Sequence, residues 1–99
     1  MSKPAHRALP AISTHELKQA LRAGPYAWPG GYPLHFWAAD LCPLSFEAVR
    51  QNYRQVLRAM RHPGTDRDWQ IIAVTVNWED SDLFCAHTGQ LIPCAYSDD

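Results

Sequence analysis

The sequence has no long apolar run and only three cysteines. No stretch approaches the roughly 18 consecutive apolar residues of a membrane span, and the first residues lack the apolar core of an export signal. An odd number of cysteines cannot pair completely within one chain, and without an export signal the thiols are expected to stay reduced in the cytosol. We therefore expect a cytoplasmic protein that does not contact membranes.

The common catalytic motifs are missing as well. The chain has no G-x-S-x-G, no Walker phosphate loop and no pair of carboxylates with a partner that stands out. The acidic residues at 79–82 lack the alternating ligands and the glycine of an EF-hand loop. We therefore expect a protein that is not an enzyme and that needs no cofactor.

The composition indicates one folded domain with uneven charge. Of 99 residues, 46% are hydrophobic and 11% aromatic, which suffices for one modest core. Eight prolines and five glycines argue against a plain helix bundle. Residues 1–65 hold eight Lys or Arg against three acids, whereas residues 66–99 hold one against seven. The net charge of −1 gives no general attraction to nucleic acids, but a basic and an acidic face can share one body.

Two segments carry helix signals. The segment Ser13–Glu16 has the form of a capping box, and Gly24-Pro25 ends the short helix that it begins. A longer helix is predicted from its N-cap Ser45 to Arg61. Its apolar residues recur near the helical period and predict one continuous stripe, formed by Phe46, Val49, Tyr53, Val56, Leu57 and Met60.

The remaining patterns indicate strands and turns. Residues 26–33 combine aromatic residues with Pro and Gly and are expected to form a loop, which Leu34–Ala38 follows as a strand. The best strand covers residues 69–78; because it is apolar on both faces, it is expected at the centre of its sheet, with Trp69 and Trp78 in the core. Residues 83–92 predict a hairpin in which Gly89 takes a positive φ.

The order of these elements predicts an α+β domain over residues 13–99. It consists of a small antiparallel sheet with a C-terminal β-hairpin, packed by one main amphipathic helix, and of a short N-terminal helix. Residues 1–12 show little periodicity and are expected to form a flexible N-terminal arm.

A cluster of potential metal ligands surrounds Cys42, Cys85 and His87. Structural zinc requires four ligands, usually as two close pairs on tight turns. Cys85 and His87 make a usable pair, but Ser45, three residues after Cys42, is a poor ligand. We therefore favour thiols that fill the core over a zinc site. A nucleophile formed by Cys85 and His87 would need a third residue that orients the histidine, and the sequence does not identify one. Further residues that could complete a zinc site are Cys94, His35 and His62.

The chain is rich in the residue types that dominate binding interfaces. Trp, Tyr and Arg lead in binding hot spots, and arginines at a spacing of four predict one outer helix face. The expected partner-binding residues are Trp28, Tyr32 and Trp37, of which Trp28 is expected to be the most exposed, together with Arg50, Arg54, Arg58 and Arg61. The same arginines could instead contact phosphates while the aromatic rings stack on bases.

Three runs of the sequence, YPLHFWAADLC (32–42), LSFEAVRQNYRQVL (44–57) and WQIIAVTVNWEDSDLFCAHTGQLIPCAY (69–96), resemble small uncharacterised proteins encoded by bacteriophages and prophages. Many of these resemble zinc ribbons with one C-x-x-C after the first strand and another in the terminal hairpin. At those positions Cys42 and Cys85 match ligands, whereas Ser45 and Thr88 replace the partner cysteines. The resemblance, which covers about residues 26–96, implies a degenerate zinc ribbon whose core replaces the metal.

The resemblance also implies a function. Small phage proteins without catalytic motifs often bind and divert a host protein, an argument by analogy. We expect a non-enzymatic, phage-derived protein-binding module that modulates or inhibits a host protein, for example a defence complex such as a CRISPR effector. The alternative is a nucleic-acid-binding degenerate ribbon that uses the Arg-rich helix face.

Overall fold

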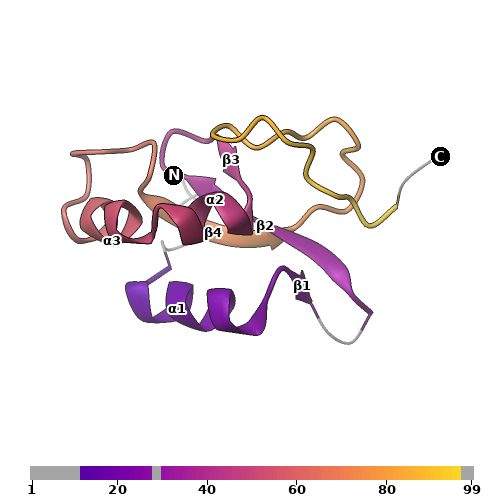
Figure 1. Ribbon diagram of the computed structural model, residues 1–99, viewed down its shortest axis with the longest axis horizontal. Coiled ribbons are helices and arrows are strands. Elements are labelled where there is room, and N and C mark those ends of the chain that lie inside the picture. Colours follow the sequence, from indigo (N-terminus) through magenta and orange to yellow (C-terminus); the bar gives the residue numbers. More distant parts are fainter. Residues whose placement is uncertain (1–11, 28–29, 97–99) are drawn as a thin grey trace, which may run out of the picture.

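The computed structural model describes residues 12–27 and 30–96, which form three helices and a four-stranded antiparallel sheet (Figure 1). This confirms the predicted α+β class. The predicted arm, except for Ile12, and Trp28 lie outside the described residues. No helix among the described residues is long and apolar enough to cross a membrane. In chain order the elements are α1 (Thr14–Ala23), β1 (Tyr26–Ala27), β2 (Tyr32–Ala38), β3 (Pro43–Leu44), α2 (Phe46–Gln51), α3 (Tyr53–Arg61) and β4 (Ile71–Val76).

Strand β2 is the centre of the sheet and pairs with all three other strands. Phe36 and Trp37 pair with both β3 and β4, so these two strands take opposite edges of β2, while β1 pairs at its start. The expectation that residues 69–78 form the central strand is therefore wrong. The chain reverses direction just before and just after β2, so the short strands β1 and β3 pair with β2, whereas β4 pairs with β2 alone.

Helix α1 begins and ends where the sequence predicts. The Oγ of Ser13 accepts from the Glu16 N–H (3.1 Å), and the Glu16 carboxylate accepts from the Ser13 N–H (2.8 Å). At the other end Gly24, with φ of 100°, donates its N–H to the carbonyl of Ala20. Local hydrogen bonds thus set both ends of this helix.

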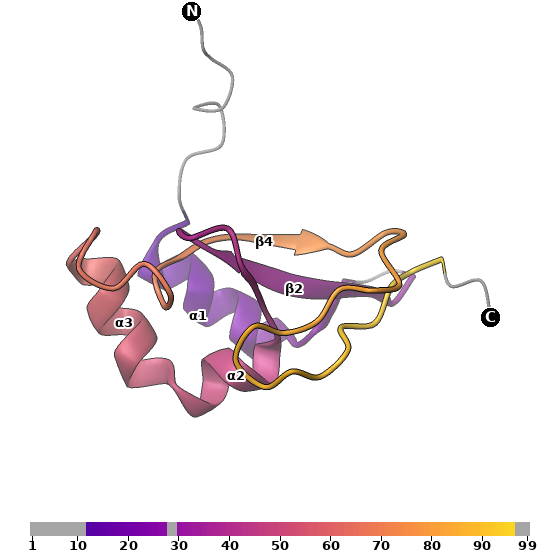
Figure 2. The same ribbon diagram turned by 90° about the horizontal axis from the view of Figure 1, so that it is seen from above.

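The predicted continuous helix from Ser45 to Arg61 is interrupted at Asn52, which is a correction to the sequence analysis. Asn52 has φ of −117° and ψ of 32°, and its side-chain amide donates to the carbonyl of Ala48 (2.9 Å), which its own N–H also contacts (3.2 Å). Such local side-chain bonds compete with the helical ladder. Helices α2 and α3 therefore run in different directions (Figure 2).

The helices cover one face of the sheet, and the core lies between the helices and the sheet (Figure 2). The rings of Phe36 and Phe46 lie 4.4 Å apart at their centroids, which joins β2 to α2. The predicted stripe is confirmed, since all its residues are buried or packed against the core. Trp69 packs against the core as expected, but Trp78 is 47% exposed because it follows the end of β4.

The C-terminal hairpin is present, with little regular strand. Phe84 and Leu91 form a single bridge, and main-chain bonds join Cys85 to Gln90 and Ile92 to Leu83. Gly89 has the predicted positive φ, 75°. The hairpin closes the core with the buried side chains of Cys85 and Ile92.

Candidate functional site

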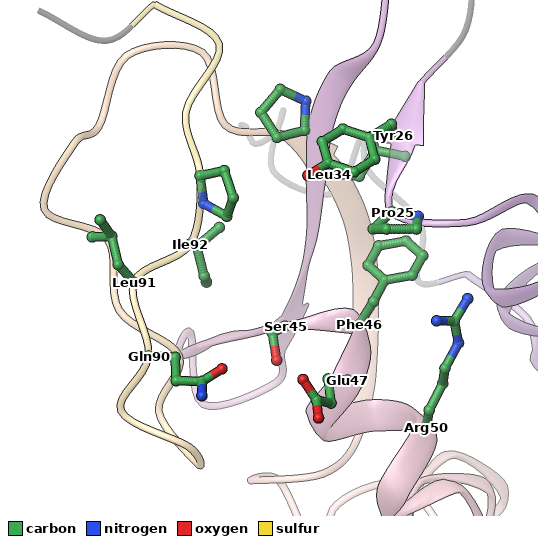
Figure 3. Close-up of a pocket in the computed structure, with 12 residues that line it drawn as sticks. Pro25, Tyr26, Leu34, Ser45, Phe46, Glu47, Arg50, Gln90, Leu91 and Ile92 are labelled. Atoms are coloured by element: carbon green, nitrogen blue, oxygen red, sulfur yellow. The ribbon is translucent and has the colours of Figure 1, made fainter. Parts of the chain in front are cut away.

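An apolar cleft lies between the hairpin and the start of α2, and it is the candidate site. It has a volume of about 290 Å³. Figure 3 shows the C-terminal chain on one side of the cleft and β1, β2 and α2 on the other. Its apolar lining consists of Pro25, Tyr26, Pro33, Leu34, Phe46, Leu91, Ile92 and Pro93, and its polar lining of Ser45, Glu47, Arg50 and Gln90.

A buried asparagine holds the hairpin side of this apolar cleft. The side-chain amide of Asn77 donates to the carbonyl oxygens of Pro93 (3.0 Å), Asp80 (3.0 Å) and, at a longer distance, Ile92 (3.4 Å). Its side-chain oxygen accepts from the N–H of Asp80 (3.2 Å). Only 4% of Asn77 is exposed. One side chain therefore positions an irregular segment that has few backbone bonds of its own.

The polar end of the cleft is formed by α2. Arg50 donates to the carbonyl of Leu21 (2.7 Å), and its guanidinium lies 5.9 Å from the centre of the Phe46 ring. Glu47 accepts from the side chain of Gln51 (3.2 Å). Because the guanidinium of Arg50 both donates a hydrogen bond and contacts the Phe46 ring, its charge has a defined position beside the cleft.

Large hydrophobic side chains are exposed around the cleft and beyond it. Leu91 (55%) and Tyr26 (43%) stand at its rim on opposite sides. The remaining large hydrophobic residues that are exposed within residues 12–27 and 30–96 are Leu41, Trp78, Phe84 and Tyr96. Of the six exposed residues, all except Tyr26 and Leu41 belong to the segment 78–96. A concentration of exposed apolar side chains on one segment is typical of an interaction surface.

Of the predicted aromatic residues, the half-buried Tyr32 contacts this exposed group and Trp37 does not. Tyr32 packs against Trp78, with ring centroids 4.9 Å apart, and Trp78 in turn stacks on Tyr96 at 6.0 Å. We call Tyr32, Trp78 and Tyr96 the aromatic cluster. Trp37 is half-buried on the other face of the sheet, where its ring N–H donates to the Thr75 hydroxyl (3.1 Å).

The predicted row of arginines spans two helices, with Arg50 on α2 and the other three on α3, and Arg50 and Arg54 line one shallow cavity at the junction. Arg54, Arg58 and Arg61 are exposed on α3, but the interruption at Asn52 separates them from Arg50. Arg50 is tied to α1 instead. The arginines of the nucleic-acid alternative therefore come from two helices, and that alternative stays a prediction.

Cys85 is buried and its sulfur is an acceptor of main-chain hydrogen bonds. It accepts from the N–H of Ser45 (3.4 Å) and of Thr88 (3.5 Å). Burial acts to raise the pKa of this thiol, but the hydrogen bonds with Thr88 and Ser45 outweigh it and lower the pKa to about 7. The structure therefore brings Ser45 and Thr88, which stand where the zinc-ribbon pattern has the partner cysteines, next to the sulfur of Cys85.

The donor set around Cys85 nevertheless does not fit a four-ligand zinc site. The Ser45 hydroxyl caps α2 by accepting from Ala48 (3.1 Å), and the Thr88 hydroxyl accepts from Gln90 (3.2 Å). Both replacement residues thus serve local turns. Nowhere in the part of the chain that the structure describes do three or more His, Cys, Asp or Glu side chains come together to hold a metal ion.

Cys42 and His87 do lie together, in a second and smaller cavity. This cavity of about 190 Å³ is also lined by Asp40, Asp68 and Trp69, and the His87 ring meets the Trp69 ring edge-on at 4.9 Å. Burial and the neighbouring Asp40 and Asp68 raise the pKa of Cys42, so its sulfur stays protonated at neutral pH. The thiolate, not the thiol, is the nucleophile and the metal ligand, so a metal ion at Cys42 would have to displace this proton. The lining of this cavity does not include Cys94, His35 or His62.

Sequence reasoning missed the apolar cleft and Asn77. The residues that line the cleft come from segments as far apart as Pro25 and Pro93, and no local pattern connects them. The one signal for Asn77 is a polar residue between apolar neighbours at the end of a strand. No family model, curated protein or solved structure matches the chain, so the resemblance to phage zinc-ribbon proteins stays a prediction.

Proposed function

We propose that the chain is a non-enzymatic protein-binding module whose partner inserts an apolar side chain into the cleft between the hairpin and α2. The observation that carries this proposal is the concentration of exposed hydrophobic residues on the segment 78–96. Leu91 and Tyr26 flank the cleft, and the aromatic cluster lies on the same segment and the neighbouring start of β2. A partner that covers them removes this apolar surface from water.

The size of the cleft supports a side chain as its occupant. Small-molecule sites usually have volumes of about 300–1,000 Å³, and this cleft, at about 290 Å³, is below that range. It suits one or two side chains of a partner. Three prolines in the lining restrict the backbone on both sides, so little conformational entropy is lost when the cleft is filled.

The aromatic cluster adds affinity to this interface. Trp78 is 47% and Tyr96 60% exposed, and fully burying a large apolar side chain contributes about 1.5–3 kcal/mol. Trp and Tyr also lose few rotamers on binding. Because Tyr32 and Tyr96 hold the Trp78 ring, the cluster presents a stable surface.

The first partner to test is a host protein, as the phage resemblance implies. The test is affinity capture from host lysate with three forms of the protein: the unchanged chain, Leu91→Glu, and Leu41→Glu. Leu41 is 72% exposed but does not line the cleft, so its variant is a matched control for an exposed leucine. Circular dichroism of each form checks that it folds.

We expect a stoichiometric partner with the unchanged chain and with Leu41→Glu, and its loss with Leu91→Glu. A charge at position 91 would lie at the rim of the cleft and would be buried without a partner in an apolar interface, which costs binding free energy. The proposal is wrong if Leu91→Glu captures the same protein in the same amount, or if no form captures a stoichiometric protein.

A further inference from the structure

A basic groove lies on the other side of Arg50, between α1 and the two following helices. Its volume is about 470 Å³, and it is lined by Lys18, Leu21, Arg22, Arg50 and Tyr53. Three of these five residues carry a positive charge. We call this set the basic groove.

The fold explains why these charges meet. Lys18 and Arg22 are four residues apart on α1, so they lie one above the other on one helix face. Arg50 comes from α2, and its bond to the Leu21 carbonyl places its guanidinium against α1 (2.7 Å). The interruption at Asn52 separates Tyr53 from α2 and makes it the first residue of α3.

Among the described residues, no carboxylate that could pair with Lys18, Arg22 or Arg50 lines the basic groove. The two nearest candidates in sequence have other roles: Glu16 completes the cap of α1, and Glu47 bonds to Gln51. Three like charges around one groove repel each other, and a bound anion relieves that repulsion.

We propose that the basic groove binds an acidic segment of a partner protein. Arg50 lines both the basic groove and the apolar cleft, so one partner segment can place an apolar residue in the cleft and acidic residues in the groove. This inference rests on the proposed function, to which it adds the charge of the partner.

A protein segment fits the basic groove better than a nucleic acid does. Leu21 and the Tyr53 ring give the groove apolar contacts that a phosphate backbone does not use. Nucleic-acid affinity grows with the number of phosphates neutralised along the strand, whereas residues 66–99 carry seven acids against one Arg and repel a long polyanion. A short acidic peptide avoids that repulsion.

The test measures fluorescence anisotropy with labelled hexaglutamate, with hexalysine and with a single-stranded oligonucleotide of similar length. It uses the unchanged chain, the double variant Lys18→Glu/Arg22→Glu, and the control Arg58→Glu/Arg61→Glu. The control makes the same change of net charge on α3, outside the groove. Circular dichroism confirms that each form is folded.

We expect hexaglutamate to bind the unchanged chain at low ionic strength. Its affinity should fall about tenfold or more in the groove variant and less than about threefold in the control. The inference is overturned by absence of hexaglutamate binding, by equal losses in the two double variants, or by tighter binding of the oligonucleotide. It is also overturned if hexalysine binds as well as hexaglutamate.

The Leu91→Glu variant separates this inference from the proposed function. It should still bind hexaglutamate, because Leu91 does not line the basic groove. If hexaglutamate fails to bind while partner capture depends on Leu91, the acidic segment is wrong and the apolar cleft stands. If hexaglutamate binds at the groove while capture ignores Leu91, the proposed function is wrong instead.

Discussion

The buried side-chain amide of Asn77 donates a hydrogen bond to the main-chain oxygen of Pro93, 3.0 Å away. Through this bond, and those to Asp80 and Ile92, one residue at the end of β4 holds the hairpin side of the apolar cleft. Nearly all of its surface is buried, so every polar atom in this network depends on its partner.

Replacing Asn77 by Ala should therefore destabilise the protein by about 1–3 kcal/mol, because one buried and two part-buried carbonyl oxygens lose their donor. The isosteric change Asn77→Asp should cost at least as much, because a carboxylate cannot donate to those oxygens. Urea unfolding followed by Trp fluorescence measures both effects. Equal stability of Asn77→Asp and the unchanged chain would contradict the role given to the amide.

We expect His35 to make the stability of the fold depend on pH. It is 2% exposed, and neither ring nitrogen has a hydrogen-bond partner among the described residues. Burial lowers the pKa of His35 below its usual 6.5, and the carboxylate of Asp80 opposes this only in part. The unfolded chain thus takes up a proton at a higher pH than the folded protein, so this stability is complete above about pH 6.5 and is lost as pH falls through the folded pKa.

We expect the free energy of unfolding to fall as the pH is lowered below about 6.5, and to fall less in His35→Phe. The phenyl ring keeps the aromatic contact with Trp37 (4.9 Å between ring centroids) and buries no unpartnered nitrogen, so His35→Phe should gain about 1 kcal/mol at neutral pH. Urea unfolding at each pH measures this. His15→Asn, a change of an exposed histidine on α1, is the control and should keep the original profile.

Arg50 should contribute to stability more than the arginines of α3 do. Its charged hydrogen bond to Leu21 and its contact with the Phe46 ring need the planar guanidinium. We expect Arg50→Lys to cost about 1 kcal/mol, less than a buried charged hydrogen bond because the site is exposed. Arg54→Lys should change stability by less than about 0.5 kcal/mol. Thermal unfolding compares the two, and equal effects would argue against a fixed Arg50.

Removal of metal should leave the protein unchanged. Because Ser45 and Thr88 use their hydroxyls in local turns, we expect excess EDTA not to alter the Tm. With Cys42 and Cys85, the double variant Ser45→Cys/Thr88→Cys carries the four thiols of the zinc-ribbon pattern, and we expect it to bind one zinc ion per chain and to lose that stabilisation with EDTA. A lower Tm of the unchanged chain in EDTA would show instead that its own residues hold a metal.

The elements that the sequence predicts correctly are those with local causes. The Ser13–Glu16 cap and the stripe from Phe46 to Met60 depend on residues three or four positions apart, and both are present. The interruption at Asn52 also has a local cause, but an asparagine on the outside of an apolar stripe does not by itself reveal whether its side chain will bond to Ala48.

The features that the sequence does not predict depend on distant residues. Apolar residues on both faces mark β4 as buried but do not reveal which strand pairs with three others. Trp78 lies beyond the end of β4 and is exposed, and the apolar cleft combines β1, β2, α2 and the hairpin. The basic groove likewise needs the packing of α1 against Arg50. These features depend on how distant segments pack together, so no periodic pattern in the sequence predicts them.

Pro33, in the middle strand, has a consequence for how the chain ends. It accepts a hydrogen bond from the Asn77 N–H (3.0 Å), but an imino nitrogen has no proton with which to return that bond. The carbonyl of Asn77 is therefore left for the N–H of Ala95, which lies 2.8 Å away. A residue with an ordinary amide at position 33 would share this acceptor with Ala95, so the proline leaves the Asn77 carbonyl fully available to the C-terminal segment.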